Sequence, residues 1–214
     1  MATQHNTQYQ TPIETLSNED LAIVEGQKAI VFNSTNNRYE GFNGSEWSAL
    51  SEGAIGQGFV DYNDASTAQT PLTLTPDTWT DVPNDKAGAF TNEVYTPQGV
   101  TSLMDGATGY LDFSQLTLGS DVMIRIDFSV TPNTNNALLE TRYILGQGAG
   151  EYPLHVRSRR LDSGSGIPYA SEKGSFYIYM GDENTLGGVG KLQIKLSTTG
   201  TLMNNGVAIK IYKK

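Results

Sequence analysis

The stretch DVMIRIDFSV (residues 121–130) decides the fold class, because apolar residues occupy every second position. A period of two predicts a β-strand with one buried face. The same alternation recurs in three later segments, 174–181, 190–197 and 207–214. Weaker strand patterns lie at 71–75, 78–82, 110–116, 137–145 and 152–161. About eight or nine strands joined by loops predict an all-β chain folded as a sandwich or jelly roll.

Composition agrees with this fold class and excludes several functions. The 214 residues include 23 glycines, 8 prolines and many Thr, Ser and Asn, which favour strands and turns. Cysteine is absent, so disulfides, thiolate nucleophiles and Cys-based zinc sites are impossible. Residues 1–10 lack the basic and apolar regions of a signal peptide. No run approaches the ~20 apolar residues of a membrane helix, so no membrane insertion is expected.

The charge is negative and unevenly distributed. The net charge is −9; residues 1–70 hold 2 basic and 9 acidic residues, and residues 71–214 hold 12 and 14. Binding to nucleic acid depends on Lys and Arg at the phosphates. No nucleic-acid partner is therefore expected.

Four regions follow along the chain. Residues 1–24 predict an N-terminal arm, in which Ser17 and Asp20 have the spacing of a helix start within 13–24. Residues 25–50 predict a small β-hairpin stalk, and 71–214 a jelly-roll head. The Gly-, Ala- and Ser-rich residues 51–70 predict a linker that could contain one strand at 58–62.

The run EGQKAIVFNSTNNRYEGFNGSEWSAL (25–50) resembles a short module of bacteriophage tail-fibre and other virion proteins. Residues 71–214 resemble, in strand number and length, the trimeric jelly-roll heads of the complement C1q and tumour-necrosis-factor families. The matching positions in the module are Gly26, Ile30, Val31, Phe32, Asn33, Ser34, Thr35, Asn37, Gly41, Phe42, Asn43, Gly44 and Trp47.

The resemblance implies a homotrimer. An isolated two-stranded hairpin is marginally stable in water, and three copies could bury their apolar residues in one core. Asn43 and Gly44 suit a type I′ turn, because both tolerate positive φ. The alternative is a hairpin packed on its own head. The predicted shared stalk core comprises Ile30, Phe32, Phe42 and Trp47.

Two further features suggest contacts. Tyr177, Tyr179 and Tyr212 lie opposite the apolar faces of their strands, as either surface tyrosines or a subunit interface. In HVRSRRL (155–161), strict alternation places His155, Arg157 and Arg159 on one face. These three could bind an acidic glycan or another anion. They could also pair with acidic residues of a neighbouring subunit or of residues 1–70, which we favour.

No catalytic pattern emerges. The chain lacks a Gly-x-Ser-x-Gly elbow, and GGVGKL (187–192) lacks the first glycine and the Ser or Thr of a phosphate loop. DYND (61–64) and DENT (182–185) suit turn capping better than calcium binding. Among 23 acidic residues, no carboxylate pair stands out as glycosidase machinery; the candidates are Asp105, Asp112, Asp182 and Glu183.

The sequence therefore predicts a non-enzymatic phage structural protein without cofactor or metal. It would be a trimeric fibre or capsid-decoration protein, assembled in the host cytoplasm and located in the virion. Residues 1–24 would bind other virion proteins, and the head would be displayed for attachment to host surface glycan. The alternatives are a carbohydrate-binding module that uses aromatic residues such as Trp79, and a small cell-surface polysaccharide depolymerase.

Overall fold

The computed structural model describes residues 14–16, 30–35, 38–42, 47–49, 56–162, 165–170 and 174–214. The chain divides into two compact units, Met1–Ile55 and Gly56–Lys214. The predicted turn at Asn43 and Gly44 and most of the predicted arm lie outside the described residues. No helix among the described residues has the length and apolar character needed to span a membrane.

The N-terminal unit contains a four-stranded sheet in the order β1-β2-β3-β4. β1 pairs with β2 in parallel, and the other two pairs are antiparallel, so the predicted hairpin is confirmed. The helical turn predicted within 13–24 is wrong at residues 14–16, because their backbone extends to pair with β2. The strands are β1 (Glu14–Leu16), β2 (Ile30–Asn33), β3 (Arg38–Phe42) and β4 (Trp47–Ala49).

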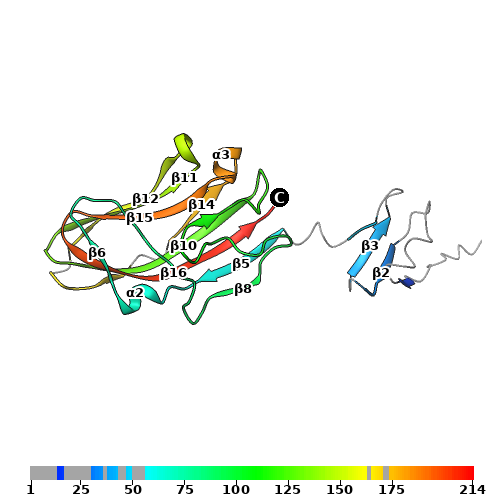
Figure 1. The fold of residues 1–214 in the computed structure, drawn as a ribbon, viewed down its shortest axis with the longest axis horizontal. Helices are drawn as coiled ribbons and strands as arrows, with labels where there is room; N and C mark the ends of the chain where they lie inside the picture. The colour runs from blue at the N-terminus through cyan, green and yellow to red at the C-terminus, as the bar shows by residue number, and fades with distance from the viewer. Residues whose placement is uncertain are drawn as a thin grey trace, which may run out of the picture. The chain divides into compact units, whose positions relative to one another are not determined.

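Two sheets face each other in the C-terminal unit (Figure 1). The seven-stranded sheet has the order β13-β10-β16-β5-β8, with β14 beside β10 and β6 beside β16. Its strands are β5 (Gln57–Tyr62), β6 (Leu72–Leu74), β8 (Asn92–Tyr95), β10 (Asp121–Pro132), β13 (Tyr169–Ala170), β14 (Ser175–Tyr179) and β16 (Gly200–Tyr212).

The five-stranded sheet has the order β12-β11-β15-β7, with β9 beside β15. Among the residues that the structure describes, three short helical turns connect strands: α2 (Ser66–Gln69), η2 (Gly148–Gly150) and α3 (Glu183–Leu186). The strands of this sheet are β7 (Thr80–Asp81), β9 (Leu111–Asp112), β11 (Ala137–Leu145), β12 (Tyr152–Leu161) and β15 (Val189–Leu196).

The pairing order makes this sandwich a jelly roll. The first and last strands of the unit in sequence, β5 and β16, pair with each other. Further in along the sequence from both ends, β7 and β9 pair with β15. β10 then pairs with β13 and β14, and β11 with β12 at the centre of the nest. All these pairs are antiparallel, as in one long hairpin rolled into two sheets. The predicted all-β fold with a C-terminal jelly roll is confirmed.

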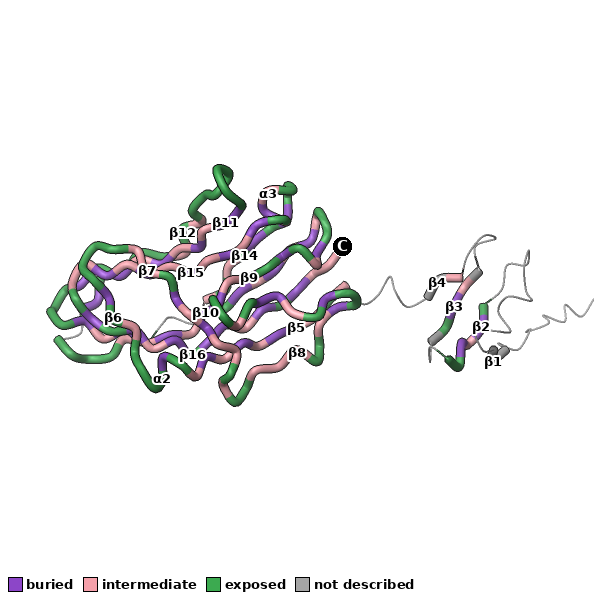
Figure 2. The backbone as a smooth tube through the Cα atoms, in the orientation of Figure 1, coloured by how far each residue is buried: buried purple, intermediate pink, exposed green. Residues whose placement is uncertain are grey.

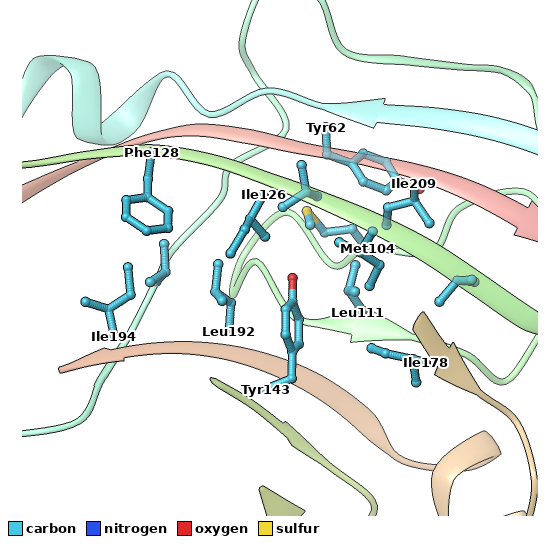
Figure 3. Packing of buried hydrophobic residues seen from close by; sticks show 14 of the residues in the cluster. Tyr62, Met104, Leu111, Ile126, Phe128, Tyr143, Ile178, Leu192, Ile194 and Ile209 are labelled. Atoms are coloured by element: carbon cyan, nitrogen blue, oxygen red, sulfur yellow. The ribbon is translucent and has the colours of Figure 1, made fainter. Parts of the chain in front are cut away.

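The core lies between the two sheets (Figures 2 and 3). Alternate residues of β10 and β15 point inward, as the period of two predicts. Figure 3 shows Phe128 of β10 above Ile194 of β15, with Tyr143 of β11 rising between the sheets. Ile194 is fully buried, and Tyr143 and Phe128 are 1% and 3% exposed. These contacts fix the separation of the sheets and position their outer faces.

The strand predicted within the linker at 58–62 is confirmed as β5, and the linker prediction for 51–70 is wrong from residue 57 onward. β5 lies inside the seven-stranded sheet, and its Val60 and Tyr62 are completely buried. Gly58 is glycine because β8 comes very close: an added Cβ would meet the Tyr95 carbonyl oxygen at 2.6 Å. Glycine here therefore serves tight packing and does not mark a linker.

A carboxylate, Asp64, fixes the loop between β5 and α2. Its oxygens accept hydrogen bonds from the Thr67 amide, the Ser66 hydroxyl and the Asp85 amide, at 2.8, 2.8 and 3.0 Å. Burial raises the Asp64 pKa, but these donors outweigh burial and hold the pKa below its usual value. Asp64 is thus most stabilising when it is ionised.

Asp64→Asn should therefore destabilise the head in a pH-dependent way. The stabilisation by Asp64 is fully present above about pH 4 and is lost as the pH falls through the lowered folded-state pKa. We expect thermal unfolding between pH 3 and pH 7 to show a loss of about 1–3 kcal/mol at pH 7 that shrinks below pH 4. Asp162→Asn, at a carboxylate whose side chain is 80% exposed, is the matched control. A deficit that stays constant with pH would contradict this assignment.

Candidate subunit interface

A row of five residues, three of them aromatic, crosses the outer face of the seven-stranded sheet. Residues that pair directly on neighbouring strands point to the same face of the sheet. Here a chain of direct pairs crosses five strands, with one residue from each strand. In order from β14 to β8, this aromatic row consists of Tyr177, Met123, Lys210, Phe59 and Tyr95.

The row is unusually exposed for apolar groups. Tyr177 and Tyr95 are 62% and 65% exposed, and Phe59 is 42% exposed. Tyr179, in the next register position of β14, is 63% exposed, and Val94 of edge strand β8 is 82% exposed. The outer face of an antiparallel sheet is usually polar when it meets only water. Clustered Tyr and Phe are typical of interfaces, so this face is the candidate subunit interface.

Charged groups mark one end of the same face. Arg125 of β10 and Asp61 of β5 both pair with Ala208 of β16, in the register position beyond the aromatic row. Burial raises the pKa of Asp61, and the Arg125 charge opposes that effect. A hollow of about 420 Å³ is lined by these two residues together with Asp127. Charges at the edge of an apolar patch restrict how a partner can be oriented.

The residues predicted to form the stalk core lie on both faces of the N-terminal sheet. Ile30 is 55% exposed, and Phe32, on the same face, packs its ring edge-on against Tyr39 with centroids 5.3 Å apart. Half-buried Trp47 lies on the other face, because its strand pairs in register with Glu40 and Phe42. Ile30 and Phe32 therefore share one face and Trp47 lies on the other, and the shared stalk core stays a prediction. The Phe42 side chain and the Asn43–Gly44 turn lie outside the described residues.

A buried polar pair, missed from the sequence, joins β2 to β3. The Asn33 amide donates to the Glu40 carboxylate at 2.9 Å, and both residues are at most 3% exposed. The Asn33 side-chain oxygen accepts from the Thr35 amide at 3.0 Å, which fixes the turn after β2. The signal was available, because Asn33 and Glu40 lie on either side of the turn between β2 and β3, at positions that a hairpin brings together.

The structure divides the predicted cluster of His155, Arg157 and Arg159. In β12, His155 pairs with Arg142 and Arg157 pairs with Thr141, so Val156 is the extra residue of a β-bulge. A bulge reverses the alternation. His155 therefore lies on the outer face of its sheet, whereas Arg157 and Arg159 share a face with core residues such as Leu139, which pairs with Arg159. The prediction that the three share a face is wrong; their role in binding stays a prediction.

Other residues singled out in the sequence have structural partners. Trp79, proposed for stacking on sugar, lies beside cations: Arg142 and Lys195 are 3.9 and 4.9 Å from its ring centroid. Asp105, Asp112 and Asp182 each accept a hydrogen bond from a backbone amide two or three residues ahead. Within the described part of the chain, no cluster of three His, Asp or Glu residues could hold a metal ion.

No protein-family model matches the chain, and no curated protein matches its sequence. The chain is similar in structure to Eiger TNF from S. frugiperda (TM-score 0.44, 7% identity, 74% of this chain and 93% of that one). It is also similar to the PRD1 vertex protein P5 (0.32, 19%, 73% and 95%) and to the infectious bursal disease virus Gt strain structure (0.36, 10%, 82% and 40%). Because these three TM-scores are below 0.5, the fold assignment rests on the strand pairing itself.

Asn33→Ala should destabilise the N-terminal sheet selectively. The change leaves the Glu40 carboxylate and the Thr35 amide without this partner, a loss of about 1–3 kcal/mol. We expect faster amide hydrogen exchange in β2 and β3 and unchanged exchange in β10 and β16. Ser34→Ala, at an exposed position of the same turn, is the control. Equal exchange in the two variants would show that the Asn33–Glu40 pair contributes little.

Proposed function

We propose that this chain is a non-enzymatic structural protein of a virion, a trimeric fibre or capsid-decoration protein. Three heads associate through the outer face of the seven-stranded sheet. Residues 1–24 attach the trimer to other virion proteins, and the displayed head serves attachment to the host surface. The observation that carries the proposal is the exposed aromatic row.

The row suits a closed ring of three copies. A cyclic trimer needs two different, mutually complementary patches on each copy, because its contacts are heterologous. The face offers two such patches: Tyr177 and Tyr179 at the β14 end, and Phe59 and Tyr95 at the β8 end. Lys210 lies between them in the row. Contact between the first patch of one copy and the second patch of the next would bury both.

The virion location rests on the sequence of the N-terminal region. Residues 25–50 carry the module that resembles phage fibre proteins, and the described part of this module forms the expected hairpin. Residues 1–12 contain no acidic residue, in contrast to the nine acidic residues of 13–70. Such a polar segment has little apolar surface to offset an ordering cost of about 1–2 kcal/mol per residue, which favours ordering against a partner.

Substituting both Tyr177 and Tyr179 with serine should dissociate the trimer. The change removes two exposed aromatic rings from one patch without touching the core. Light scattering should give three times the 23.2 kDa chain mass for the unmodified protein and a much smaller mass for the variant. Leu138→Ser is the control, since Leu138 is 40% exposed on the five-stranded sheet. A stable monomer of the unmodified protein at micromolar concentration would refute the trimer.

Deleting residues 2–12 should separate assembly from attachment. The truncated chain retains every residue that the structure describes, so we expect normal folding and trimerisation but loss from virus particles. Cosedimentation with particles, quantified by immunoblot, measures incorporation. A chain with residues 2–12 in scrambled order controls for length and composition. Normal incorporation of the truncated chain would exclude the anchoring role.

A further inference from the structure

A pocket opens between the two sheets of the head, at the edge where β12 faces β13 and β14. It lies away from the aromatic row, and its lining comes from strands of both sheets. The volume is about 80 Å³. A cavity of about 150 Å³ holds benzene, so this one has room for roughly three or four carbon atoms.

The floor of the pocket is apolar. Ile126 and Phe128 of β10 and Leu139 of β11 are 7%, 3% and 4% exposed. Val156 and Phe176 complete the walls and are partly buried. Such a floor favours a small hydrocarbon group over a hydrated polar one.

One polar group breaks this apolar lining. Thr141 lines the pocket and is 3% exposed, yet its hydroxyl has no hydrogen-bond partner among the described residues. Buried hydroxyl groups without a partner are costly and rare. A ligand oxygen in the pocket would satisfy this group.

Two guanidinium groups lie at the rim. The bulge at Val156 turns Arg157 and Arg159 toward the pocket side of β12, and both line it. The Arg159 guanidinium lies 4.9 Å from the ring centroid of Tyr169, which also lines the pocket. Gly174 leaves room for the Arg157 guanidinium, because an added Cβ there would be 3.0 Å from Arg157 Nη2. Planar guanidinium groups bind carboxylates in a bidentate manner.

We propose that this pocket binds a small carboxylate whose body is a short hydrocarbon chain. The carboxylate pairs with Arg157 and Arg159 at the rim and accepts a hydrogen bond from Thr141. The hydrocarbon body occupies the floor formed by Ile126, Phe128 and Leu139. The site is independent of the proposed subunit interface, which lies on the outer face of the sheet.

Titration of the full chain with butyrate, followed by NMR of the isoleucine and leucine methyl groups, tests the site. We expect saturable shifts at Ile126 and Leu139, no comparable binding of butyramide, and weaker binding of inorganic phosphate. Butyramide has the same shape without the charge, and phosphate has charge without the hydrocarbon body. Equal binding of butyramide, or tighter binding of phosphate, would overturn the ligand class. No saturable shift with butyrate would overturn the site.

Three variants connect binding to the named residues. Replacing both Arg157 and Arg159 with glutamine should weaken butyrate binding at least about tenfold, because charge-assisted hydrogen bonds are lost. Arg160→Gln is the matched control: Arg160 is exposed and pairs with Leu138, on the other face of β12. Thr141→Val should weaken binding several-fold without lowering the unfolding midpoint. An equal effect of Arg160→Gln, or unchanged binding in Thr141→Val, would contradict the proposed contacts.

Discussion

The head depends on the position of its last strand in the middle of a sheet. β16 pairs with β10 along almost its whole length on one side, and with β5 and β6 on the other. Its Leu202, Ile209 and Ile211 are completely buried. No local contact replaces these pairings, because the partners lie tens to more than a hundred residues away. Ordering each residue costs about 1–2 kcal/mol, so the sandwich becomes stable only when its C-terminal strand closes it.

Alternation predicted the strands whose pattern is simple. β10, β14 and β15 were located from period two alone, because each buries one face against the opposite sheet. β16 was found only from 207 onward, although it begins at Gly200. The alternation is interrupted near Gly206, where φ is +130° and the register against β10 shifts. β5 was predicted only as a strand within a linker, since Gly58 resembles a linker glycine but is required by the close approach of β8.

The prediction of the sites was limited in the same way, because one irregularity in a strand changes which side chains share a face. Strict alternation grouped His155 with Arg157 and Arg159, and one bulge separates them. A signal was present: apolar Leu154 and Val156 occupy even positions, whereas Leu161, which is 1% exposed, occupies an odd one. All three can point inward only if the strand contains an extra residue between them. By contrast, the aromatic row could not be assembled from sequence, because it requires the register of five strands.

Both proposed sites on the head follow from how a jelly roll ends its sheets. Nested pairing leaves each sheet with edge strands, and here β8 and β12 are two of them. At β8 the exposed side chains are apolar, and contact with a second copy would remove their surface from water. At β12 a bulge twists the edge and turns two arginines toward the gap between the sheets, where Thr141 lacks a partner. What this pocket lacks is a hydrogen-bond partner for Thr141 in a small volume beside two guanidinium groups, which a second copy's flat face supplies poorly and a small anion supplies well.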